Sequence, residues 1–277
     1  MKRACGGLWI VFVLALTLFV PTVAAQSPAP DKPEQADAPD EPAANPARPT
    51  IANPATLTPV GYLQFETGVL GAADSGEFSS RTSLNEVVKL AVASRLMLIL
   101  GSGEPYVHYE DPFGQRGHAW GDISVGAQAV LKPGEGANPT LAVNYLYHAH
   151  DGGGPDLDLG SPKHSLVVLA SADVKGFHGD FNVLFNELTA GNLRRGQFGQ
   201  TISISHPLKG NFSIGGELWH FTQPFSRGNA VGSLWNIGYT ARKNLVFDIG
   251  FNRGLTGSST HWEGFAGVTY LLPHKLW

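Results

Sequence analysis

Apolar and polar residues alternate along the chain from about residue 60 to the C-terminus. Near that end, Leu245, Phe247, Ile249 and Phe251 alternate with a second set that is mostly polar or glycine: Asn244, Asp248, Gly250 and Asn252. Successive side chains of a β-strand point to opposite faces, so this period of two separates an apolar face from a polar one. Aromatic-rich apolar faces opposite polar, glycine-rich faces are typical of a transmembrane β-barrel, which has lipid outside and water or polar side chains inside.

The alternation predicts twelve strands, joined in turn by short turns and longer loops. The expected strands cover residues 60–71, 79–92, 95–104, 119–131, 138–148, 163–174, 177–187, 196–206, 210–222, 230–240, 243–253 and 260–272. The expected long loops are 72–78, 105–118, 149–162, 188–195, 223–229 and 254–259. Short turns at one end and long loops at the other are typical of bacterial outer-membrane barrels, whose short turns face the periplasm. We therefore predict an all-β fold, an antiparallel transmembrane barrel formed by residues 59–277.

A soluble all-β sandwich is the alternative, because it also has one apolar face. Polar residues on the face that would form its core argue against it, among them Asn144, Asn182, Asn236 and Asp248. Each would need a hydrogen-bond partner in a dry core. Aromatic residues near the expected strand ends also favour the membrane barrel, since aromatic girdles flank its apolar band.

The N-terminal residues indicate export. Basic Lys2 and Arg3 precede an apolar run, residues 8–20, and small residues follow at 23–25. This run is shorter than the roughly 20 residues of a membrane-spanning helix, so residues 1–25 are predicted to be a signal peptide. Residues 26–58 are rich in proline, alanine and acidic residues, which predicts a disordered periplasmic leader whose residues 53–56 can pack against the barrel mouth.

Charge and cysteine content narrow the function further. Removing Lys2 and Arg3 with the signal peptide changes the net charge from −4 to −6, and no basic stripe is present, so nucleic acid is not an expected partner. The only cysteine, Cys5, lies in the predicted signal peptide, which leaves the mature chain without a thiol. The expected partners are outer-membrane lipid, a small-molecule solute, and the barrel-assembly machinery, which would read the last strand and the terminal Trp277.

Four segments resemble a family of bacterial outer-membrane barrels that are labelled transporters and grouped with the MetA-pathway phenol-degradation proteins. They are NPATLTPVGYLQFETGVL at 53–70, LNEVVKLAVASRLMLIL at 84–100, GDISVGAQAVL at 121–131 and GFAGVTYLLPHKLW at 264–277. The resemblance implies an outer-membrane barrel of transporter type. It identifies no particular substrate, because these segments are strand patterns and the family has no site motif to carry over.

Eight charged residues are candidates for the lumen lining, because they fall on the predicted lumen face of the barrel. They are Glu66, Lys89, Arg95, Asp122, Lys163, Glu217, Asp248 and Glu263. Such residues can pair across a narrow interior and hold the barrel together, or they can line a water path and set its selectivity. The sequence leaves both roles open. If the last strand closes against the first, Glu66 and Glu263 come close together.

Histidines supply the remaining candidates for chemistry. His148 and His150 share a strand face and His164 follows the next loop, a spacing that could form a metal site at the rim, although solvated histidines are the commoner case. An outer-membrane hydrolase would need a nucleophile beside a histidine, and Ser205-His206 and His220 are the nearest candidates. None of these forms a recognisable motif, so no metal, cofactor or enzymatic activity is expected.

The sequence therefore predicts an outer-membrane channel or facilitator for the passive passage of a small molecule. Uptake of a hydrophobic or aromatic compound is the narrower expectation that the resemblance carries. Trp219, Phe221 and Phe265 have the inward parity and fit either such a ligand or simple packing of the lumen. The alternative is a structural or adhesin-like barrel with a filled interior.

Overall fold

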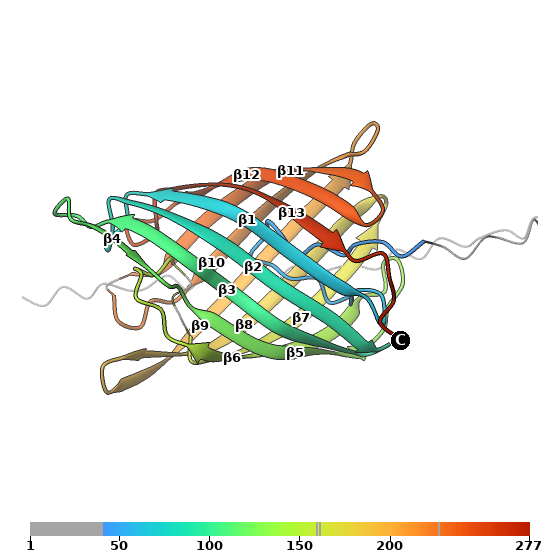
Figure 1. The fold of residues 1–277 in the computed structure, drawn as a ribbon, viewed down its shortest axis with the longest axis horizontal. Helices are drawn as coiled ribbons and strands as arrows, with labels where there is room; N and C mark the ends of the chain where they lie inside the picture. The colour runs from blue at the N-terminus through green and yellow to red at the C-terminus, as the bar shows by residue number, and fades with distance from the viewer. Residues whose placement is uncertain (1–40, 159, 161, 227) are drawn as a thin grey trace, which may run out of the picture. The chain divides into compact units, whose positions relative to one another are not determined.

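The computed structural model describes residues 41–158, 160, 162–226 and 228–277, which form a closed antiparallel β-barrel (Figure 1). Its strands are β1 (Leu63–Ala73), β2 (Ser80–Ala93), β3 (Leu96–Glu110), β4 (Arg116–Ala119), β5 (Ile123–Lys132), β6 (Thr140–His150), β7 (His164–Val174), β8 (Phe177–Ala190), β9 (Leu193–Pro207), β10 (Phe212–Phe221), β11 (Ala230–Arg242), β12 (Leu245–Gly254) and β13 (Trp262–Leu271). The predicted signal peptide and residues 26–40 lie outside the described residues.

The sheet closes because β1 pairs with β13 on one side and with β2 on the other. Consecutive strands pair with each other throughout, except that β4 pairs only with β3, so β5 pairs with β3 in its place. The barrel wall thus has twelve strands, as predicted, and β4 only lengthens a hairpin that projects beyond the wall (Figure 1). A sheet that closes on itself also excludes the two-sheet sandwich.

The two faces of the wall have the predicted parity. On β12, Ile249 is 60% exposed on the outer face, whereas the adjacent Asp248 is 8% exposed and faces the interior. Aromatic pairs lie on the outer face toward both ends, with Phe212 beside Tyr239 at the short turns and Phe251 beside Trp262 at the long loops. Apolar outer residues between aromatic girdles are the arrangement that a bilayer requires. In the described residues, no helix is both long and apolar enough to cross a membrane.

The two ends of the barrel differ in the length of their connections. One end, the short-turn end, has connections 94–95, 133–139, 175–176, 208–211 and 243–244. The other, the long-loop end, carries the β3–β4 hairpin and the β6–β7 connection. The expected loop 188–195 is wrong, because β8 and β9 continue to a two-residue turn at Gly191 and Asn192. Gly191 has a φ of 57°, and a two-residue hairpin turn with glycine at its first central position requires such a positive φ.

Residues 45–58, here called the N-terminal plug, lie inside the barrel, whereas the sequence predicted a disordered leader that packs at the barrel mouth only through residues 53–56. They enter from the end where the C-terminus lies (Figure 1). They form no helix or strand, and their backbone groups instead bond to inward-facing side chains of the wall. Ile51 and Leu57 pack on an interior apolar cluster that includes Leu169, Trp219 and Phe221. A proline-rich segment cannot join a sheet ladder, but a polar lumen wall can satisfy its backbone.

Candidate functional site

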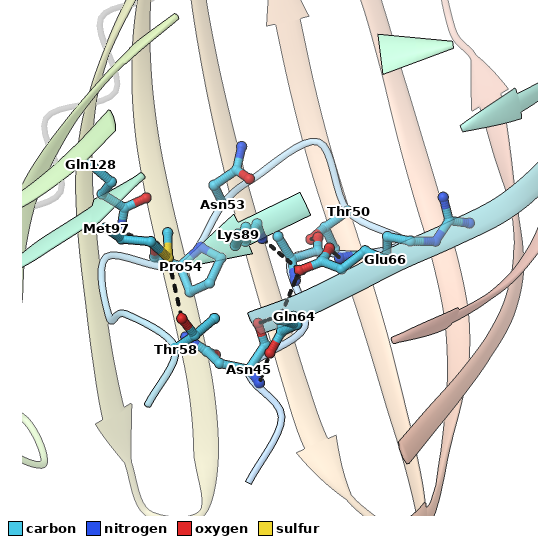
Figure 2. Close-up of polar contacts among 12 residues, drawn as sticks. Asn45, Thr50, Asn53, Pro54, Thr58, Gln64, Glu66, Lys89, Met97 and Gln128 are labelled. Atoms are coloured by element: carbon cyan, nitrogen blue, oxygen red, sulfur yellow. Dashed lines mark hydrogen bonds and ion pairs between the residues drawn. The ribbon is translucent and has the colours of Figure 1, made fainter. Parts of the chain in front are cut away.

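Glu66 joins the plug to the wall of the barrel (Figure 2). Its side chain is fully buried on β1, and its Oε1 lies 2.6 Å from Nζ of Lys89 on β2. The backbone N–H groups of Ala47 and Arg48 donate to the same carboxylate at 3.3 and 3.2 Å. Neighbouring Gln64 accepts from the backbone N–H of Asn45 at 2.9 Å. A buried carboxylate with a cation and several donors around it is compensated, so this ion pair anchors the start of the plug.

The middle of the plug is held from the opposite side of the lumen. The carboxylate of Glu217 on β10 accepts from the backbone N–H groups of Ile51 and Ala52, both at 2.8 Å. Asn182 on β8 accepts from the Asn53 N–H at 2.6 Å and donates to the Asn53 carbonyl at 2.9 Å. Side chains of the wall thus form hydrogen bonds with the plug backbone, in place of the backbone hydrogen bonds that a strand or helix would provide.

Arg48 reaches across the lumen into a socket formed by two glycines. Gly68 and Gly267 face each other on β1 and β13, and a Cβ atom on either would lie 2.4–2.5 Å from the Arg48 guanidinium. The same guanidinium forms an ion pair with Asp248 at 3.4 Å. The absence of two side chains from the inner wall therefore makes room for one long side chain of the plug.

Above the plug, toward the long-loop end, lies a cavity of about 300 Å³. Three inward aromatic residues line it, Trp219, Phe221 and Phe265, and the first two are stacked at 5.3 Å between ring centroids. Inward glycines seat these rings, since a Cβ atom on Gly232 would lie 2.2 Å from Trp219 and one on Gly250 would lie 2.6 Å from Phe265. The cavity thus has an apolar, aromatic side that is fixed by the strands themselves.

The β6–β7 connection borders the cavity on the side opposite the plug. Asp158 accepts from the backbone N–H of Thr260 at 2.8 Å, and its own carbonyl accepts from Gln223. Arg81 on β2 donates to the Pro155 carbonyl at 2.9 Å. Burial raises the pKa of the Asp158 carboxyl, although the hydrogen bonds from Thr260 oppose the shift. This connection is therefore docked into the barrel mouth, and its docking removes the Asp158 carboxylate from part of its water, which is unfavourable.

The predicted charged residues are divided between the interior and the two ends. Five are buried inside the barrel: Glu66, Lys89, Glu217, Asp248 and Glu263. Asp122 lies at the long-loop end, where its Oδ1 accepts from the Gly152 N–H, and Lys163 lies there too, 5.0 Å from the Tyr147 ring centroid. The prediction that Arg95 lines the lumen is wrong. Residues 94–95 form the turn between β2 and β3, and the Arg95 side chain is exposed at the short-turn end. Glu66 and Glu263 both border the cavity.

The histidine candidates lie on different faces. His148 is buried and points inward, with Nε2 3.0 Å from Asp151, whereas the His164 ring lies beside Tyr145 and Tyr147. Tyr145 and Tyr147 are exposed on the outer surface, so the three histidines do not converge. No group of three potential metal ligands occurs within the described ranges.

The hydrolase candidates are also separated. Ser205 and His206 are consecutive on β9, so their side chains point to opposite faces, and the His206 ring packs on Phe177 at 4.5 Å between centroids. His220 has a buried Nδ1 with no hydrogen-bond partner among the described residues. None of these groups therefore has the serine–histidine contact that nucleophile activation requires.

Several site residues were not identified from the sequence. The inward parity of β1 and β12 would have identified Gln64 and Asn252, which alternate correctly with the lipid-facing residues. The plug residues Arg48 and Asn53 carry no such signal. Their partners are 200 and 129 positions away, and no periodicity links a proline-rich segment to one particular strand.

Comparison with solved structures agrees with this architecture. The chain is similar to the NanC porin at 12% identity over 74% of this chain and 98% of that chain, with a TM-score of 0.53. A porin refined at high resolution matches at 10% identity over 76% of this chain and 100% of that chain, with a TM-score of 0.38. Neither a protein-family model nor a curated protein sequence matches the chain. The likeness to the NanC porin shows that the fold is that of an outer-membrane β-barrel.

Proposed function

We propose that the protein is an outer-membrane channel for the passive passage of a small molecule, and that the plug closes it in the state described here. The cavity of about 300 Å³ inside the lumen carries this proposal, because it is a solute-sized space between the plug and the long-loop end. The inner wall is rich in polar side chains, including Asn144, Asn182 and Gln197, as a water path requires. The short-turn end would then face the periplasm.

The contacts of the plug are of a kind that can be exchanged. It is attached by side-chain hydrogen bonds and two interior ion-paired groups, not by a sheet ladder. A neutral hydrogen bond of this kind contributes about 0.5–1.5 kcal/mol net and one to a carboxylate about 1.5–3 kcal/mol, because water can replace either partner when the lumen is hydrated. Displacing the plug would leave a polar wall that remains solvated, which is why we assign the plug a gating role.

Conductance in planar bilayers tests the proposal. The mature chain should give rare, brief current steps, and a variant lacking residues 45–58 should give larger and stable ones. Heat-modifiable gel migration should be unchanged in the variant, since every barrel strand is retained. If neither protein gives steps in several lipids, the channel proposal is wrong.

The second candidate is a structural or adhesin-like barrel, and the filled lumen favours it. Ile51, Ala55 and Leu57 pack on the interior cluster as core residues would. The same conductance experiment separates the two functions, because a structural barrel stays silent with or without the plug. Passage of a hydrophobic or aromatic compound is the narrower form of the channel proposal, and the aromatic side of the cavity supports it.

A further inference from the structure

We propose that the lumen cavity binds a small organic cation, with its charge at Glu263 and its apolar or aromatic body among Trp219, Phe221 and Phe265. This inference rests on the proposed channel function, because it names the class of solute that would pass. It follows from two features of the cavity, the aromatic side described above and the distribution of charge among its lining carboxylates.

Most charges around the cavity are already compensated by the protein. The ion pairs are Glu66 with Lys89, Glu104 with Arg81, and Asp248 with Arg48. Within the described part of the chain, three carboxylates that border the cavity form no ion pair with a basic side chain: Glu263, Asp158 and the more exposed Glu86. Glu263 and Asp158 are close enough to repel each other. The charge of Arg81 also acts on Glu263, but the Arg81 guanidinium is paired with Glu104.

Glu263 is nine-tenths buried and is oriented toward the cavity by a hydrogen-bond chain. Trp219 donates to Asn252 at 2.9 Å, and Asn252 donates to Oε1 of Glu263 at 3.1 Å. A buried carboxylate that lacks a counter-charge is unfavourable, and a bound cation would supply that charge. The chain begins at one of the aromatic residues, so the carboxylate and the rings border the same space.

Aromatic rings beside a carboxylate form a suitable site for an ammonium group on an apolar body. The negative ring faces attract a cation, and their area buries its apolar part. An anion would instead be repelled by Glu263 and the other carboxylates that lack a basic partner, while the nearby basic groups are occupied by Glu66, Glu104 and Asp248. A neutral analogue would leave the Glu263 charge uncompensated.

Binding to the mature protein in detergent micelles tests the inference. Benzylammonium, benzyl alcohol and benzoate share a ring and differ in charge, so titration calorimetry with each isolates the charge effect. We expect benzylammonium to bind and the other two to bind at least roughly tenfold more weakly, the difference that one charged hydrogen bond gives. Tryptophan fluorescence should follow the titration, because Trp219 is 2% exposed at the cavity and Trp219→Phe should abolish the change.

Variants of the carboxylates complete the test. Glu263→Gln should weaken benzylammonium binding roughly tenfold or more, and Glu110→Gln, which alters an ion-paired acid at the outer end of β3, should not. If Glu263→Gln fails to fold, Asp158→Asn in the β6–β7 connection should weaken binding in the same direction. Equal binding of benzyl alcohol or benzoate, no binding of benzylammonium, or unchanged binding by a folded variant would overturn the inference. Conductance without cation binding would refute only this solute class, whereas binding without conductance would refute the channel and leave the site.

Discussion

Glycine on the inner face decides where the larger interior side chains lie. Arg48 occupies the space that side chains at Gly68 and Gly267 would fill, and Trp219 occupies the space beside Gly232. These glycines could be placed on the inner face from the alternation alone. Their partners could not, because a missing side chain does not indicate which distant residue enters the space.

The Arg48 socket gives a prediction at the level of single residues. Gly267→Leu should expel the guanidinium and break its ion pair with Asp248, and the plug should move because it is the flexible partner. Hydrogen exchange of residues 47–52 should then become faster. Gly264→Leu is the matched control on the same strand, since nothing lies within 4 Å of its added Cβ. Equal exchange in both variants would show that the socket does not hold the plug.

The lipid face can be tested at Ile249, which is 60% exposed in the middle of β12. Ile249→Arg should reduce the free energy of unfolding by about 2–4 kcal/mol, because it places a charge near the bilayer midplane. Leu208→Arg, in the connection between β9 and β10, should cost about 0–1 kcal/mol because it lies at the membrane boundary. Denaturant titration in lipid vesicles measures both, and similar losses would place the hydrocarbon band elsewhere.

At the scale of elements, strands were predictable and the plug was not. Each barrel strand repeats its pattern over ten or more residues, so the period of two appears many times in one segment. The plug has no period, and its order depends on side chains such as Glu217, 165 and 166 positions along the chain. The turn at Gly191 could have been predicted from the sequence. A Gly-Asn pair between two strand patterns is a signal for a two-residue turn, and the expected loop 188–195 did not take it into account.

The plug should respond to a single atom change at Glu217. Its carboxylate accepts two backbone N–H groups, whereas the amide of Glu217→Gln has only one acceptor oxygen and turns a donor toward the other. An unsatisfied buried donor costs about 1–3 kcal/mol, so exchange at Ile51 and Ala52 should accelerate roughly fivefold or more. Glu187→Gln, at a more exposed ion pair with Arg194, is the control. Unchanged exchange at both amides would show that these bonds do not fix the plug.

Docking of the β6–β7 connection should depend on pH through Asp158. Burial raises its pKa above the ordinary value of 3.8, so the docked form binds the proton more tightly than the open form does. Docking is therefore favoured at low pH and weakens as pH rises through the raised pKa. The protection of residues 152–158 against hydrogen exchange, measured relative to the intrinsic rate at each pH, should decrease over that range in the native protein. Asp158→Asn keeps an acceptor for Thr260 and removes the charge, so its protection should not change with pH in this way. A variant that retains the change would implicate another group.

In the molecule as a whole, the barrel wall is determined by local sequence patterns, whereas the filling of its lumen is determined by contacts between residues far apart in the sequence. Closure follows from local alternation that is repeated in twelve strands of 10 to 15 residues, a pattern that the sequence displays directly. Occupancy of the lumen follows from long-range pairing between a segment without periodicity and side chains on many strands. The charged residues predicted to line a water path illustrate the difference. Glu66 and Glu217 do face the interior, but in this state they bind the plug.

Orientation in the membrane gives the last prediction. Outer-membrane barrels place short turns in the periplasm, so the β3–β4 hairpin should be outside the cell and the 208–211 turn inside the periplasm. The mature chain is expected to lack cysteine, so one introduced cysteine reports one position. Phe113→Cys, at a hairpin tip where the native side chain is 89% exposed, should react with a membrane-impermeant maleimide on intact cells. Lys209→Cys should react only after the outer membrane is permeabilised. Preferential labelling at 209 on intact cells would reverse the orientation and place the cavity on the periplasmic side of the plug. Equal labelling would contradict the assignment of the two ends to opposite sides of the membrane.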